Sequence, residues 1–94
     1  NVCDFNLSSI ETLTLNNNLI GDKGAEILSL CDLFELKILH LSCNFITNIG
    51  VDFLCFGQYR NLTTLTLDGN KFRNRNNAER MIRSNLKFCK LINL

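Results

Sequence analysis

An α/β fold in the form of a short, curved solenoid is the architecture that this sequence of 94 residues indicates. Aliphatic residues recur with a fixed period of 26, which is typical of a repeat architecture. Inside each period, apolar positions first alternate as in a strand and then follow a helical spacing. We therefore expect about three parallel strands on the concave face, helices on the convex face and a capping helix at the carboxyl end.

The repeat is clearest in three blocks at 13–18, 39–44 and 65–70, which read LTLNNN, LHLSCN and LTLDGN. Flanking apolar residues keep the same register: Ile10, Leu36 and Leu62 before the blocks, and Ile20, Ile46 and Phe72 after them. The period divides one domain, 1–94, into the tail of a preceding repeat (1–9), two repeats (10–35 and 36–61) and a third repeat with its cap (62–94).

Each block has the pattern of a strand followed by a turn. Leu13 and Leu15, two residues apart, point to one face of a strand, while Thr14 points to the other. An asparagine closes each block: Asn18, Asn44 and Asn70. Stacked asparagine side chains satisfy backbone groups that such a turn leaves unpaired, so we expect a structural role for them.

Helical segments follow the first two blocks and begin near Gly24 and Gly50. Two pairs of residues in them share one face at three-residue spacing: Ala25 with Leu28, and Val51 with Leu54. Five other apolar residues fall away from these stripes: Ile27, Leu30, Phe34, Phe53 and Phe56. We favour the interpretation that they tuck underneath short helices, over the alternative of an apolar convex surface.

The pattern L-x-x-L-x-L-x-x-N-x-[LIF], with its continuations at 21–28 and 48–54, resembles the leucine-rich repeat of the ribonuclease-inhibitor-like subclass. The resemblance covers residues 7 to 94. It implies a horseshoe-shaped solenoid whose strand face and adjoining edge bind another protein. Ran GTPase-activating proteins share this repeat class, so regulation of a GTPase or another enzyme through the same face is an alternative.

The third copy departs from the pattern after its block. Asn76, followed three residues later by Glu79, resembles a helix-capping box, so we expect a helix from about 77 to 87. The side chains that we expect to pack inward are Ala78, Met81, Ile82 and Leu86, and those that we expect to be solvent-exposed are Arg80, Arg83 and Lys87. The period of 26 then places Phe88 and Leu91 inward but Asn93 at a leucine position, which favours a terminal cap over a fourth strand.

The amino-terminal end shows no polar cap and no initiator methionine. We therefore expect the chain to be the carboxy-terminal part of a longer solenoid. Its first repeat would expose unpaired strand groups and apolar core, and we expect that end to favour self-association.

Nine residues point outward from the strands and form the candidate partner-binding face: Thr12, Thr14, Asn16, Ile38, His40, Ser42, Thr64, Thr66 and Asp68. Three strands present roughly 200 Å², against about 800 Å² per partner in a standard interface, so we expect the adjoining edge or further repeats to contribute. Ile38 replaces a threonine of its neighbours and is a candidate contact anchor.

Catalytic and metal-binding chemistry is not expected. His40, Ser42 and Asp68 are the residue types of a hydrolytic triad, but the face has no nucleophile elbow, no oxyanion donors and no means to exclude water. His40 and Cys43 have a metal-like spacing, yet their side chains point to opposite faces of a strand. We expect no enzyme activity, no cofactor and no metal.

Charge is polarised along the chain: residues 1–70 carry a net charge of −5, and residues 71–94 a net charge of +6. The basic end comprises Lys71, Arg73, Arg75, Arg80 and Arg83, followed by Lys87 and Lys90. Binding of an anionic surface, phosphoinositide or RNA is a second alternative function. The run has no aromatic platform for bases, so we expect a solvated cap and no nucleic-acid binding.

The five cysteines, Cys3, Cys31, Cys43, Cys55 and Cys89, are an odd number without a close pair. We interpret them as small buried residues in a reducing compartment, and therefore expect an intracellular, cytoplasmic protein. No run of apolar residues is long enough to span a membrane. The partner that we expect is another protein.

Overall fold

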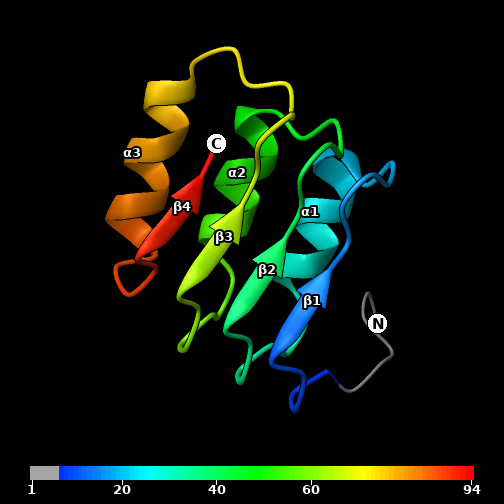
Figure 1. Cartoon of the computed structure of the whole chain (residues 1–94), viewed down its shortest axis with the longest axis vertical. Helices are drawn as coiled ribbons and strands as arrows, with labels where there is room; N and C mark the ends of the chain where they lie inside the picture. The colour runs from blue at the N-terminus through cyan, green and yellow to red at the C-terminus, as the bar shows by residue number, and fades with distance from the viewer. Residues whose placement is uncertain (1–6) are drawn as a thin grey trace.

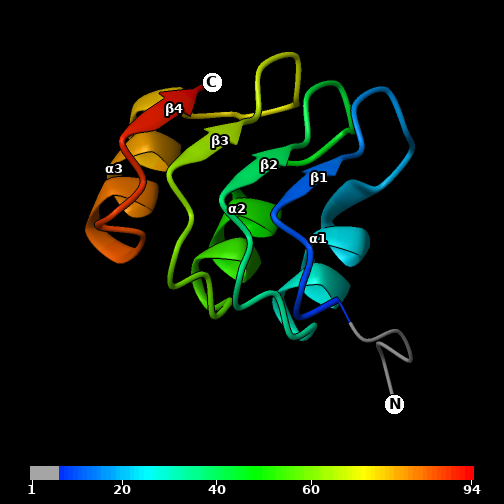
Figure 2. The same ribbon diagram turned by 60° about the horizontal axis from the view of Figure 1, so that its bottom comes forward.

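Strands and helices alternate along the chain in the computed structural model, which describes residues 7–94 (Figure 1). The elements are β1 (Thr12–Thr14), α1 (Gly21–Ser29), β2 (Ile38–His40), α2 (Asn48–Cys55), β3 (Thr64–Thr66), α3 (Arg75–Asn85) and β4 (Leu91–Asn93). The strands form one parallel sheet in the order β1-β2-β3-β4, with the helices along one of its faces (Figure 2). The α/β class is confirmed. Of the expected tail at 1–9, residues 1–6 lie outside the described part of the chain.

The first three strands pair in the register that the repeat predicts. Leu13 lies opposite Leu39, and Leu39 opposite Leu65, in steps of 26 residues. Leu39 and Leu65 are buried, as are Leu41 and Leu67, while the residues between them face outward. Alternation along each strand therefore separates a core face from an outward face, as expected.

The fourth strand corrects the prediction of a terminal cap without a strand. Leu65 pairs with Ile92, 27 residues later, so the third repeat is one residue longer than the others. Because side chains alternate along a strand, a slip of one residue reverses which of them face the core. Ile92 and Cys89 therefore pack inward, whereas Phe88 and Leu91, which we expected inward, are 73% and 59% exposed.

The asparagines form the predicted hydrogen-bonded column between repeats. The backbone N–H of Asn18 donates to Oδ1 of Asn44, and that of Asn44 to Oδ1 of Asn70, both at 2.9 Å. Asn44 Nδ2 donates to the carbonyl of Leu15 at 2.8 Å, and Asn44 is completely buried. These bonds satisfy turn groups that would otherwise lie unpaired in the core.

Helices α1 and α2 begin earlier than expected, at Gly21 and Asn48. The Thr47 hydroxyl caps α2 by accepting the N–H of Ile49 at 3.1 Å, and this cap fixes the start before Gly50. Gly50 lies instead at a close approach, because a Cβ there would come within 2.6 Å of Ile46 Cγ2.

The third helix, α3, is shifted in the same direction, to Arg75–Asn85. Its cap is Asn74, whose side chain accepts the N–H of Asn77 at 2.9 Å, so the expected cap at Asn76 is wrong. The expected inward residues Ala78, Ile82 and Leu86 are buried. A capping pattern locates such a helix start only to within a residue or two.

The helix side of the molecule is more apolar at its surface than we expected. Phe34 and Phe53 are half-buried, but Ile27, Leu30 and Phe56 are exposed. A helix of about two turns buries only one stripe of side chains, which ends at Leu28 in α1 and at Leu54 in α2. Leu30 and Phe56 each follow two residues later, and therefore lie on the opposite side of the helix. The expectation that these residues tuck underneath is therefore wrong for Ile27, Leu30 and Phe56.

The cysteines differ from the expected set of buried thiols. Cys31 is disulfide-bonded, whereas Cys43, Cys55 and Cys89 are free, and Cys43 is exposed. Cys3 lies outside the described residues. Spacing along a sequence does not reveal which sulfur atoms meet in space, and the argument for a reducing compartment fails at Cys31. Within residues 7–94, no helix is long and apolar enough to cross a membrane.

Candidate functional site

The outward face of the sheet contains all nine predicted residues and two more from β4. The parallel register aligns them in rows across the strands. The first row is Thr12, Ile38, Thr64 and Leu91; the second is Thr14, His40, Thr66 and Asn93; and Asn16, Ser42 and Asp68 follow at the ends of the first three strands. We call these eleven residues the strand face.

The first row carries the apolar groups of the strand face. Ile38 is half-buried, and Leu91, on the far side of Thr64, is 59% exposed. Sequence reasoning found Ile38 but assigned Leu91 to the core, because the period of 26 fails in the third repeat. The signal that could have found Leu91 is the alternative register, which places Cys89, Ile92 and Leu94 inward together.

Hydrogen bonds hold the polar rows in place. His40 Nδ1 lies 2.9 Å from Thr66 Oγ1, and Ser42 Oγ lies 3.3 Å from the same hydroxyl. Ser42 Oγ donates to Asp68 Oδ1 at 2.5 Å, and the Ser42 N–H donates to Asn16 Oδ1 at 2.8 Å. The polar side chains are thus ordered before any partner arrives.

The order of these bonds differs from that of a hydrolytic triad. A triad requires the serine to donate to the histidine and the histidine to the carboxylate. Here Ser42 donates to Asp68, and His40 contacts Thr66 instead. Cys43 Sγ packs over Gly69 in the next turn, and the part of the chain that the structure describes holds no group of three or more metal-ligating side chains.

A second surface adjoins the strand face where the strands lead into the helices (Figure 2). Leu19, Phe45 and Lys71 occupy equivalent positions 26 residues apart, and the Lys71 ammonium lies 5.7 Å from the Phe45 ring centroid. Leu19 is 85% exposed, and Phe45 and Ile49 are also exposed. We call Leu19, Phe45, Ile49 and Lys71 the turn edge. The repeat spacing could have found it, since each member of the equivalent trio follows the asparagine of its block.

The backbone of Phe45 is unusual among these residues. Its φ of +61° is a left-handed conformation that a bulky side chain rarely adopts. Its ring gains little burial in return, because it is 54% exposed. Strained, exposed positions of this kind concentrate at functional sites.

The predicted basic end is not gathered into one patch. Lys71 lies over Phe45, Arg73 lines a groove with Asp22, and Arg83 pairs with Glu79 at 2.9 Å. Arg75 and Arg80 are exposed at different turns of α3. The charges are spread from one end of the helix to the other, so no observation favours the anionic-surface alternative there.

Comparisons with protein-family models, with curated proteins and with solved structures found no match to this chain. Over residues 7–94, the geometry defines a small α/β fold with a four-stranded parallel sheet, three helices on one face and an ordered, partly apolar surface on the other.

Proposed function

We propose that this chain is a non-catalytic protein-recognition module of the leucine-rich-repeat kind, which binds a protein partner through the strand face and the turn edge. One observation carries the proposal: two outward aliphatic side chains, Ile38 and Leu91, lie beside a network of fixed donors and acceptors. Apolar anchors surrounded by ordered polar groups are the usual anatomy of a protein interface.

Three features support the repeat class. The pairing of β1, β2 and β3 follows the 26-residue period, a hydrogen-bonded asparagine column joins the repeats, and the helices α1, α2 and α3 lie on one side of a parallel sheet. A horseshoe-shaped solenoid of the ribonuclease-inhibitor-like subclass would have each of these features. The stacking of strand on strand and helix on helix is the way repeats bury one another's apolar sides.

The size of the strand face favours additional contact surface. Each strand is three residues long, and with the residues that follow the strands the face is about five residues deep. Four such strands about 4.8 Å apart present roughly 300 Å², against about 800 Å² in a standard interface. The turn edge supplies part of the difference through Leu19 and Phe45.

Further repeats of a longer solenoid would supply the rest. At the β1 end, a groove of about 390 Å³ is lined mostly by apolar side chains: Leu15, Leu19, Ile20, Ile27 and Leu28, with Asn18 and Gly24. A preceding strand-and-helix unit would cover this groove as the second unit covers the first. The self-association expected of the isolated chain would use the same end.

The proposal is tested by affinity capture with two double variants of matched chemistry. Ile38→Glu with Leu91→Glu places two charges on the strand face, and Leu30→Glu with Phe56→Glu places the same two charges on the helix side. Circular dichroism checks that both retain the fold. We expect a partner held by the wild type and the helix-side variant and lost by the strand-face variant. Capture that is equal for the two variants would contradict the proposal.

A further inference from the structure

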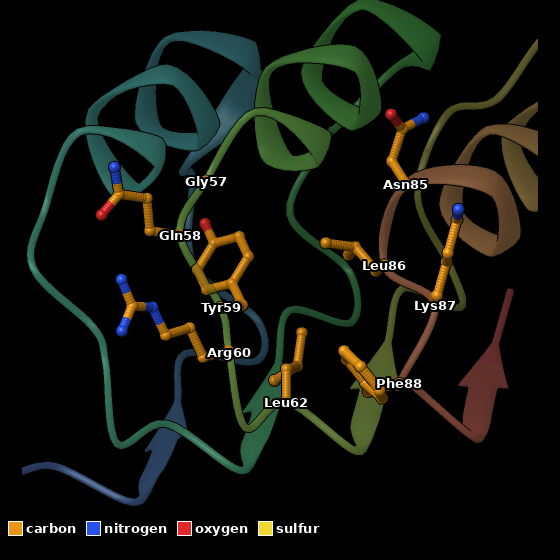
Figure 3. Close-up of a pocket in the computed structure, with 9 residues that line it drawn as sticks. All are labelled: Gly57, Gln58, Tyr59, Arg60, Leu62, Asn85, Leu86, Lys87 and Phe88. Atoms are coloured by element: carbon orange, nitrogen blue, oxygen red, sulfur yellow. The ribbon is translucent and has the colours of Figure 1, made fainter.

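A cavity of about 370 Å³ lies at the opposite end of the sheet from the turn edge, between the loop that follows α2 and the loop that follows α3 (Figure 3). The first loop lines it with Gly57, Gln58, Tyr59, Arg60 and Leu62, and the end of α3 and the second loop line it with Asn85, Leu86, Lys87 and Phe88. The volume is within the range of small-molecule sites.

Tyr59 breaks the pattern of the repeat at this cavity. The equivalent residues of the neighbouring loops are Leu33 and Leu86, and all three side chains are buried. Gly57 makes room for the larger ring, because a Cβ there would lie 2.2 Å from Tyr59 Cε2. A hydroxyl group is thus placed in a column that is otherwise leucine.

The hydroxyl of Tyr59 has no hydrogen-bond partner in the part of the chain that the structure describes, although it is buried. Buried polar groups are nearly always paired, and an exception calls for an explanation. Burial, and secondly the Cys55 thiolate that forms at high pH, raise the pKa of Tyr59, so the hydroxyl keeps its proton and can donate to an acceptor.

The entrance of the cavity is positively charged. Arg60 and Lys87 line it, and Lys90 lines an adjacent groove that shares Arg60 and Phe88 with it. No aspartate or glutamate lines either space, and none of the ion pairs found among the described residues involves these three cations. The Arg60 guanidinium lies 5.7 Å from the Phe34 ring centroid, a contact that leaves its charge without a carboxylate, so these charges are available to an anion.

An apolar contact surface lies between the cations. Phe88 lines both spaces and is 73% exposed. In Figure 3 the Arg60 and Lys87 side chains point away from each other on either side of the cavity, and both are exposed, so binding of one anion by both requires a change of rotamer in each.

We infer that this cavity binds a small ligand that carries an oxyanion, a carboxylate or a phosphate, on a planar apolar group. Arg60 and Lys87 bind the oxyanion, because guanidinium and ammonium groups donate charge-assisted hydrogen bonds to it. Phe88 contacts the planar group. The Tyr59 hydroxyl, which points toward Gly57 in Figure 3, donates to an acceptor of the ligand that displaces the side chains now enclosing it. The site is separate from the strand face and does not depend on the proposed protein recognition.

The test is a titration of the ¹⁵N-labelled chain, followed by NMR, with benzoate, phenyl phosphate and uncharged benzyl alcohol. We expect saturable shifts in amides of residues 57–62 and 85–88 with an anion, and at least tenfold weaker binding of benzyl alcohol. The tighter of the two anions identifies carboxylate or phosphate as the group recognised. Absence of shifts with both anions at 20 mM, or equal binding of benzyl alcohol, would overturn the inference.

Variants assign the binding to the named residues. Arg60→Gln with Lys87→Gln is expected to weaken binding of the anion at least tenfold, whereas Arg75→Gln with Arg80→Gln, which removes the same charge from α3, leaves it unchanged. Tyr59→Phe keeps the ring and is expected to weaken binding about fivefold without lowering the melting temperature. Equal loss in both double variants, or full affinity in Tyr59→Phe, would refute the assignment.

Discussion

At the scale of single residues, Phe45 shows backbone strain without compensating burial. Its left-handed φ is a conformation that costs an L-residue roughly 1–2 kcal/mol and glycine almost nothing. The Phe45→Gly variant is therefore expected to raise the free energy of unfolding by about 0.5–1 kcal/mol in urea denaturation. Phe56 is a matched control, since it is an exposed phenylalanine with ordinary helical φ and ψ. Phe56→Gly should be destabilising, and equal destabilisation by both changes would contradict the strain.

Asn44 is the residue on which the column between repeats depends most. Its completely buried side chain accepts from the N–H of Asn18 and donates to the carbonyls of Leu15 and Ser42. Asn44→Ala should lower the free energy of unfolding by about 1–3 kcal/mol, because it removes three hydrogen bonds of a buried side chain and leaves the N–H of Asn18 without its acceptor. Asn18→Ala, at an exposed end of the column, should cost about 1 kcal/mol or less. Denaturation curves that rank the two variants in the opposite order would refute this role.

The cysteines are expected to differ in reactivity. Burial, with a smaller contribution from Asp52, raises the pKa of Cys55 to about 11, so at pH 8 roughly one molecule in a thousand carries its thiolate. Since only the thiolate is alkylated, Cys55 should react far more slowly than exposed Cys43, and its rate should rise up to about pH 11. Cys31 should stay unmodified until a reductant is added. Peptide mapping after iodoacetamide treatment of the folded chain measures all three, and early labelling of Cys31 would contradict the disulfide.

At the scale of elements, the residue that caps α3 differs between the sequence-based expectation, Asn76, and the structure, Asn74. The Asn74 side chain accepts a hydrogen bond from the N–H of Asn77 in the first turn, whereas Asn76 lies within the helix. Asn74→Ala should cost about 1 kcal/mol of stability, and Asn76→Ala little or nothing, since alanine is a good helix residue. Thermal unfolding of the two variants is the measurement. A larger loss at position 76 would restore the original capping box.

The elements that could be predicted are those in which the 26-residue period holds. It located three strands, their outward threonines and the asparagine column, because identical spacing places equivalent residues side by side. It missed β4 and Leu91 because one additional residue in the third repeat reverses the faces. The left-handed turn at Phe45, the disulfide at Cys31 and the unpaired hydroxyl of Tyr59 depend on three-dimensional contacts that periodicity does not encode.

At the scale of the whole molecule, the two sides of the sheet both expose apolar side chains, and the proposed function assigns a partner to only one of them. Leu91 on the strand face and Leu30 on the helix side form a natural matched pair, since the same side chain is 59% exposed at one position and 57% exposed at the other. Any difference between the molecules that contact these two positions is therefore due to the surface on which each lies, and not to the residue type or its accessibility.

Photo-crosslinking from these two positions tests recognition through the strand face most directly. A benzoylphenylalanine at position 91 or position 30 is irradiated in extract, and covalent adducts are identified by mass spectrometry. The account predicts a discrete protein adduct from position 91 that is absent from position 30 and is abolished when Ile38→Glu is added. A discrete adduct from position 30 alone would contradict it and assign recognition to the helix side.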